Sequence, residues 1–76
     1  MELKDFIEKF ATQFEEIDAS EITADTEFKT LEEWSSLIAL STLALVDEMY
    51  NVTIQGKDIR ESETIEDLFN VIKSLK

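Results

Sequence analysis

The sequence predicts an all-α fold: a small antiparallel four-helix bundle with three long helices, a short third helix and a long loop between the first two. Three observations support this prediction. One Gly and no Pro occur in 76 residues, and so few turn residues disfavour a hairpin-rich fold. Several segments have helical periodicity or consist of good helix formers. The chain has about half the usual length of a domain, so residues 1–76 are expected to form one domain.

The first amphipathic segment covers residues 3–16. Its apolar side chains recur mostly at helical intervals and therefore share one face. They are Leu3, Phe6, Ile7, Phe10, Phe14 and Ile17. The periodicity is lost over residues 18–34, where we expect a long loop, and loops of this length are often functional. The apolar side chains expected to anchor it are Ile22, Phe28, Leu31 and Trp34.

The second helix is predicted over residues 36–50, where a Ser supplies the N-cap and good helix formers follow. An extended stretch and one short helical turn around Ile59 come next. The last helix begins at Thr64, which forms an approximate capping box with Asp67. The apolar stripe of this helix consists of Ile65, Leu68, Phe69, Ile72 and Leu75.

Composition excludes several classes of function. The 18 acidic and 7 basic residues give a net charge of −11, which argues against a nucleic-acid partner and favours basic protein surfaces. A hydrophobic content of 43% indicates a folded core. The absence of Cys and His removes the central residues of nucleophilic triads and of most zinc sites. No EF-hand pattern is present. We therefore expect neither an enzyme nor a metal site.

No segment is expected to carry the chain into or across a membrane. The N-terminal residues lack the basic and then apolar layout of a secretory signal. No apolar run approaches the roughly 20 residues that span a bilayer. The expectation is a cytoplasmic protein that acts as a monomer.

The second helix is apolar on nearly all sides. A helical wheel predicts a core stripe of Ala39, Leu43, Val46 and Tyr50. Leu37, Ile38 and Leu45 lie roughly opposite this stripe. A small bundle cannot readily bury one helix on all sides. These three residues therefore either pack under the long loop or contact a partner.

The charge pattern favours a partner. No Lys or Arg occurs between Thr30 and Gly56. An apolar face bracketed by carboxylates suits a basic-rimmed apolar patch on another protein. The candidate docking residues in this window are Glu32, Glu33, Leu37, Ile38, Leu45, Asp47 and Glu48.

At the start of the second helix, the triplet Ser35-Ser36-Leu37 follows a long loop in an acidic chain of 76 residues. In this position the triplet is similar to the Asp-Ser-Leu signature of the acyl carrier proteins. The chain resembles that family over nearly its whole length, from the amphipathic first helix to Thr64-Ile65 at the start of the last helix.

The resemblance implies that Ser36 carries 4′-phosphopantetheine, attached as a phosphodiester from coenzyme A by a separate phosphopantetheinyl transferase. Acyl groups or related intermediates would be carried as thioesters between the acyl-loading and acyl-using enzymes of fatty acid, polyketide or related biosynthesis. The carrier itself would catalyse nothing. A helix N-terminus favours the phosphate, and a thiol on the arm would account for the absence of Cys.

A Ser at the start of a helix is, taken alone, more simply an N-cap. Leu37 directly follows Ser36, and this register assigns the modification to Ser36. Ser35 then takes the structural role of the family's Asp.

The chain departs from the family at its recognition surface. Ser35 replaces the acidic residue, and Ile38 and Ser41 occupy outward positions that are often acidic in fatty acid carriers. Glu33 and Trp34 replace small residues before the motif. We therefore add Ser41 to the docking residues and expect a dedicated set of partners in a specialised pathway. The alternative function is an unmodified acidic helical module that binds a basic partner.

Overall fold

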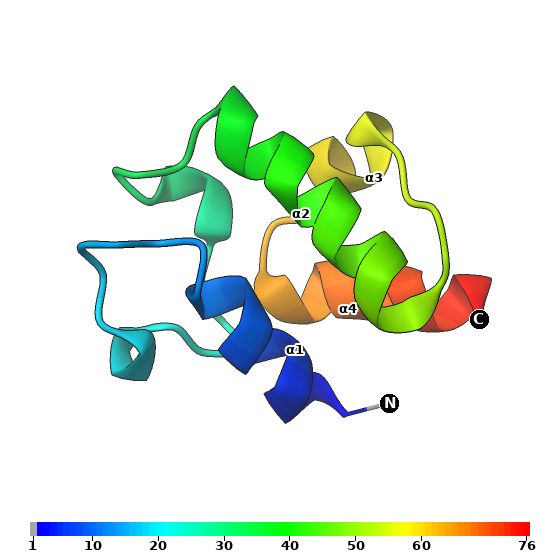
Figure 1. Ribbon diagram of the computed structural model, residues 1–76, viewed down its shortest axis with the longest axis horizontal. Helices are drawn as coiled ribbons and strands as arrows, with labels where there is room; N and C mark the ends of the chain where they lie inside the picture. The colour runs from blue at the N-terminus through cyan, green and yellow to red at the C-terminus, as the bar shows by residue number, and fades with distance from the viewer. Residues whose placement is uncertain (1) are drawn as a thin grey trace.

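Four α-helices and two short 3₁₀ turns make up the computed structural model, which describes residues 2–76 (Figure 1). The α-helices are α1 (Leu3–Ala11), α2 (Ser36–Tyr50), α3 (Gly56–Glu61) and α4 (Ile65–Leu75). The 3₁₀ turns η1 (Ala19–Glu21) and η2 (Phe28–Thr30) lie in the long loop between α1 and α2. No strand occurs among the described residues. The predictions of an all-helical fold, a short third helix and a long first loop are confirmed.

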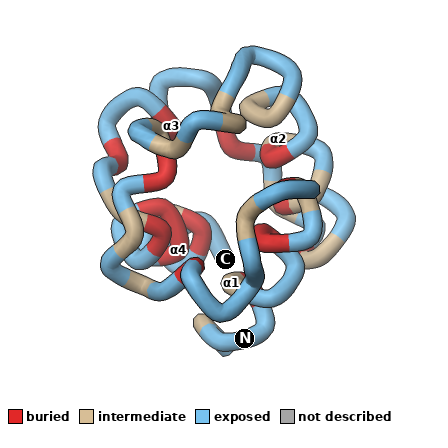
Figure 2. The backbone as a smooth tube through the Cα atoms, turned by 90° about the vertical axis from the view of Figure 1, so that its left-hand side faces the viewer, coloured by how far each residue is buried: buried red, intermediate tan, exposed pale blue. Residues whose placement is uncertain are grey.

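Each helix packs mainly against two others. α1 contacts α2 and α4, and α3 also contacts α2 and α4. The long loop occupies the left side of Figure 1, beside α1 and the first turns of α2. Buried positions concentrate along α4 and on the inward sides of α1 and α2 (Figure 2).

The first helix is shorter than the periodicity predicts, because it ends at Ala11 and not at residue 16. After Ala11 the backbone tightens into bonds of the i to i−3 type, in which Gln13 N–H donates to Phe10 O and Phe14 N–H donates to Ala11 O. The Thr12 hydroxyl also donates to Lys9 O at 2.6 Å. A spacing of three residues keeps Phe14 on the buried face even though the α-helix has ended.

An aromatic cluster ties the long loop to α1. Phe10 and Phe28 are fully buried, with ring centroids 5.6 Å apart in an edge-to-face arrangement. Trp34 packs edge-on against Phe28 with centroids 5.1 Å apart. The predicted anchors Ile22 and Phe28 are buried, and Leu31 and Trp34 are half-buried against the same core. The loop therefore has a defined path across the bundle.

The loop also caps α4. The carbonyls of Ala24 and Thr26 accept hydrogen bonds from the N–H groups of Glu66 and Ile65, at 3.0 and 3.2 Å. The predicted capping box is confirmed, because Thr64 Oγ1 accepts from Asp67 N–H and the Asp67 carboxylate accepts from Thr64 N–H, both at 3.1 Å. The hydrogen bonds that the Asp67 carboxylate accepts from the backbone N–H groups of Thr64 and Glu63 lower the pKa of Asp67 below its ordinary value. The backbone N–H groups of the first turn of α4 would be unpaired at a free helix end. Here the loop and the capping box provide their acceptors.

Tyr50 is the one member of the core with an unsatisfied polar atom among the described residues. Its ring packs against Phe6 and Phe69, but its buried hydroxyl has no hydrogen-bond partner within residues 2–76. Burial raises the pKa of Tyr50 above its ordinary value of 10.0, and the Asp5 carboxylate raises it further. A buried hydroxyl without a partner costs about 1–3 kcal/mol.

We expect Tyr50→Phe to raise the free energy of unfolding by about 1 kcal/mol at pH 7 in urea titrations, because it removes the unpaired hydroxyl and keeps the ring. The unfolded chain releases the Tyr50 proton at lower pH than the folded chain does. Wild-type stability should therefore fall as the pH rises from 10, by an increment that Tyr50→Phe lacks. A less stable variant at pH 7 would show that the hydroxyl is hydrogen-bonded.

Candidate modification site and docking face

Two adjacent serines have different roles at the start of α2. Ser35 has an extended backbone (φ −154°, ψ 173°), and its hydroxyl accepts a hydrogen bond from the N–H of Ile38 at 3.3 Å. Ser35 is therefore the N-cap. Ser36 is the first residue of the helix and is exposed. Its hydroxyl is thus available at the end of α2 that carries the positive pole of the helix dipole.

Ser36 opens onto a cleft of about 530 Å³. The walls come from the end of the long loop, the N-terminal half of α2, and α3. The lining residues are Lys29, Trp34, Ser35, Ser36, Ala39, Leu40, Leu43, Gly56, Ile59 and Arg60. Half of them are apolar, so the cleft can receive a chain that is itself partly apolar.

Two basic residues also line this cleft. Lys29 comes from η2, and its Nζ donates to the backbone carbonyl of Arg60 at 2.7 Å. The Arg60 side chain lies over Gly56, with Nη1 3.5 Å from the position that a Cβ there would occupy. The sequence suggested a window around Ser36 without cations. In three dimensions, residues from either side of that window bring positive charge back to the site.

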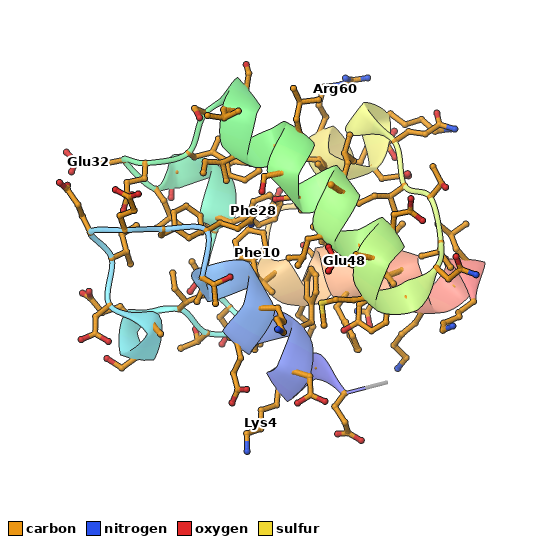
Figure 3. All side chains as sticks on the ribbon, viewed as in Figure 1. Lys4, Phe10, Phe28, Glu32, Glu48 and Arg60 are labelled. Carbon is orange, nitrogen blue, oxygen red and sulfur yellow. The ribbon has the colours of Figure 1, made fainter. Side chains whose placement is uncertain are left out.

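The outer face of α2 is apolar at one end and acidic at the other. Leu37 and Leu40 are 74% and 63% exposed. Asp47 and Glu48 are exposed near the C-terminal end of the helix, and Figure 3 shows Glu48 on the front of α2. The exposed residues of this face are Leu37, Leu40, Ser41, Ala44, Asp47 and Glu48, which we call the α2 face. Leu40 also lines the cleft, so the face and the cleft are continuous.

The buried face of α2 is rotated from the predicted one. Val46 and Tyr50 are buried as expected, but Ala39 and Leu43 are only half-buried. The centre of the buried face includes Thr42, which is completely buried. Of the apolar residues predicted opposite the core, Leu37 is exposed, Leu45 is half-buried and Ile38 packs against the core. Packing against the core thus accounts for Ile38.

The predicted core stripe of α2 does not include Thr42, because the stripe consists of residues with apolar surfaces and Thr42 is polar. Its hydroxyl donates to the Ile38 carbonyl at 2.9 Å and accepts from Gln13 Nε2 at 3.1 Å, so it is satisfied inside the core. One available signal was its position four residues from both Ile38 and Val46, on the same side of the helix. The bond to Gln13 links α2 to the turn that follows α1.

Glu32 and Glu33, which precede the triplet Ser35-Ser36-Leu37, differ in exposure and in hydrogen bonding. The Glu33 carboxylate accepts hydrogen bonds from the N–H groups of Glu15 and Glu16 at 3.0 and 2.9 Å. It therefore joins the two ends of the long loop, a role that the sequence did not suggest. Glu32 is exposed and lies at the outer edge of the loop (Figure 3).

Comparison with known proteins gives no match: no family model, curated protein or solved structure is similar enough to identify a family. Among residues 2–76, no group of three or more acidic, His or Cys side chains is placed to hold a metal ion. No helix of that part of the chain is long and apolar enough to cross a membrane.

Proposed function

We propose that the protein is an acyl carrier: an antiparallel helical bundle, located in the cytoplasm, that bears 4′-phosphopantetheine on Ser36. The observation that carries this proposal is the division of roles between the two serines. Ser35 supplies the N-cap, which leaves the exposed Ser36 hydroxyl free at the helix start beside an apolar cleft. Because Ser36 is not used for capping, its hydroxyl is free to be modified.

The attachment is a substitution at phosphorus. The Ser36 oxygen bonds to the phosphorus that bears the pantetheine of coenzyme A. The bond to adenosine 3′,5′-bisphosphate breaks, and the serine proton is lost to a base of the transferase. The positive end of the α2 dipole and the N–H groups of its first turn favour the phosphodiester that results. The thiol at the end of the arm then carries acyl groups as thioesters, which a chain without Cys cannot do by itself.

The cleft suits the arm and a short cargo. Its apolar residues lie beside the attachment point and would shield part of a flexible chain from water. They are Trp34, Ala39, Leu40, Leu43 and Ile59.

The α2 face is the proposed docking surface for the transferase and for the acyl-loading and acyl-using enzymes. Leu37 and Leu40 supply exposed apolar area at the modification site. Asp47 and Glu48 place negative charge at the C-terminal end of this face, and Glu32 adds an exposed carboxylate in the loop before α2. This pattern complements an apolar patch with a basic rim. Leu45, Ile38 and Glu33 are more buried or already engaged, so we assign them a smaller share of the contact.

The test is an incubation of the unmodified protein with coenzyme A and a broad-specificity phosphopantetheinyl transferase, followed by intact mass measurement. The carrier function predicts a gain of one phosphopantetheine group. Failure to gain mass with several transferases would favour the second candidate, an unmodified module that binds basic proteins. The exposure of Leu37 and Leu40 supports that candidate too, because a docking face does not require a modified serine.

We expect Glu48→Lys to lower kcat/KM of the transferase reaction roughly 3- to 10-fold at low salt, because a reversed charge on the docking surface slows association with a basic partner. The loss should shrink at high salt. Glu8→Lys, an equal change on an exposed residue of α1, is the matched control. Equal losses in both variants would attribute the effect to net charge and would remove the α2 face from the proposal.

A further inference from the structure

The charge of the cleft is opposite to the charge of the protein. Carboxylates outnumber cations 18 to 7 in the chain. Yet the charged residues that line the cleft are Lys29 and Arg60, and none of the lining residues is acidic. In a protein with a net charge of −11, the surrounding field repels anions. Local cations favour anion binding in spite of this field, and two cations line the cleft beside Ser36.

Lys29 is fixed by a hydrogen bond, whereas the side chain of Arg60, which also lines the cleft, is exposed. Lys29 is half-buried, and one donor of its ammonium group is used on the Arg60 carbonyl, which leaves two donors for a ligand. The same bond joins η2 to α3, so the two walls of the cleft are linked through these residues. The Arg60 guanidinium lies over Gly56, another lining residue, and offers a planar fork suited to oxyanions. Figure 3 shows Arg60 at the upper edge of the molecule, above α3.

We propose that Lys29 and Arg60 form an anion-binding site in this cleft, which holds an anionic oxygen group connected to an apolar chain. The site rests on the proposed function, because Ser36 lines the same cleft and would deliver the ligand to it. Two parts of the modified protein can supply this anionic oxygen group: the phosphodiester of the arm, or a terminal carboxylate of the cargo. The phosphodiester is the nearer source, since it is bonded to Ser36 itself.

A purely structural role for the two cations makes a different prediction. If Lys29 only tethers η2 to α3, its replacement lowers stability equally with and without the arm. If the pair binds an anion, replacement of either residue removes an effect that appears only after modification. The cation-to-amide changes Lys29→Gln and Arg60→Gln remove the charge and retain polar side chains. Lys57→Gln is the matched control, because Lys57 is exposed on α3 and does not line the cleft.

The experiment compares four forms of each protein: unmodified, with the free-thiol arm, with a pentanoyl arm and with a glutaryl arm, the last two transferred from the acyl-coenzyme A. Intact mass is read first for each form. NMR then follows the Arg60 Nε–H, the Trp34 indole N–H and the backbone amides of the cleft. We expect modification to shift these signals in the wild type and in Lys57→Gln. We expect at least half of each shift to be lost in Lys29→Gln, and at least half of the Trp34 and backbone amide shifts to be lost in Arg60→Gln. All of these shifts should be weaker at high salt.

The forms separate the two sources of the anion. If the NMR signals are already fully shifted with the free-thiol arm, the bound anion is the phosphodiester. Shifts seen with glutaryl but not with pentanoyl identify a cargo carboxylate. Modification that succeeds but shifts neither the Arg60 nor the Trp34 signal would overturn the anion site and leave the carrier function standing. Equal shifts of the Trp34 and cleft amide signals in Arg60→Gln and in the wild type would do the same. A mass that never changes would instead overturn the carrier function and the anion site together.

Discussion

Ser36→Ala is expected to abolish the gain of phosphopantetheine completely, because it removes the only atom of residue 36 that can form the phosphodiester. It should leave the free energy of unfolding within about 0.5 kcal/mol of the wild type, since Ser36 is exposed and Ala is a good helix former. Intact mass after incubation with coenzyme A and transferase measures the first effect. Urea titration measures the second.

Ser35→Ala is the matched control and should behave in the opposite way. Loss of the cap to the Ile38 N–H is expected to cost about 1 kcal/mol of stability. Modification should remain complete at long incubation, because the Ser36 hydroxyl is unchanged. If Ser35→Ala blocks modification while Ser36→Ala does not, the roles that we give to the two serines are reversed.

Phe10→Ala is expected to have the largest effect on stability. Phe10 is fully buried, and its ring contacts Phe6, Phe14, Phe28 and Trp34. Truncating such a residue costs about 3–5 kcal/mol, which is a large share of the free energy of unfolding of a domain, about 5–15 kcal/mol in general. Because Phe28 and Trp34 belong to the long loop, the loop should loosen from α1 first. Urea titration and the fluorescence of Trp34 measure both effects.

Leu37→Ala serves as the control for Phe10→Ala, because Leu37 is 74% exposed and its truncation should change stability by no more than about 0.5 kcal/mol. Phe10→Leu retains part of the buried apolar volume, so it keeps the comparison possible if Phe10→Ala does not fold. A loss below about 1 kcal/mol in Phe10→Ala would show that the aromatic cluster does not hold the loop.

The helices could be predicted because their signals are local. The capping box of Thr64 and Asp67, the cap of Ser35 and the apolar stripe of α4 depend on residues within one or two turns of each other. The end of α1 could not be predicted, because Phe14 keeps the apolar spacing while the backbone changes to tighter turns. Periodicity describes which face is buried, and here it continues past the end of the helix.

The site could be predicted only in part. The exposure of Ser36 and Leu37 follows from their place at the start of α2. The role of Glu33 and the burial of Thr42 depend on contacts with residues 17 to 29 positions away in the sequence, which no local pattern reports. Lys29 and Arg60 are 31 residues apart and meet only because η2 packs against α3. Their effect on the charge around Ser36 could be recognised only from the fold.

The most direct test of the carrier function is to locate the added group by fragment mass spectrometry. No Lys or Arg lies between Thr30 and Lys57, so trypsin releases residues 30–57 as one peptide that contains both serines of the motif. We predict that fragments ending at Ser35 keep their unmodified mass and that fragments ending at Ser36 carry one phosphopantetheine. An unmodified peptide after incubation with active transferases, or a modified group on another residue, would contradict the proposal.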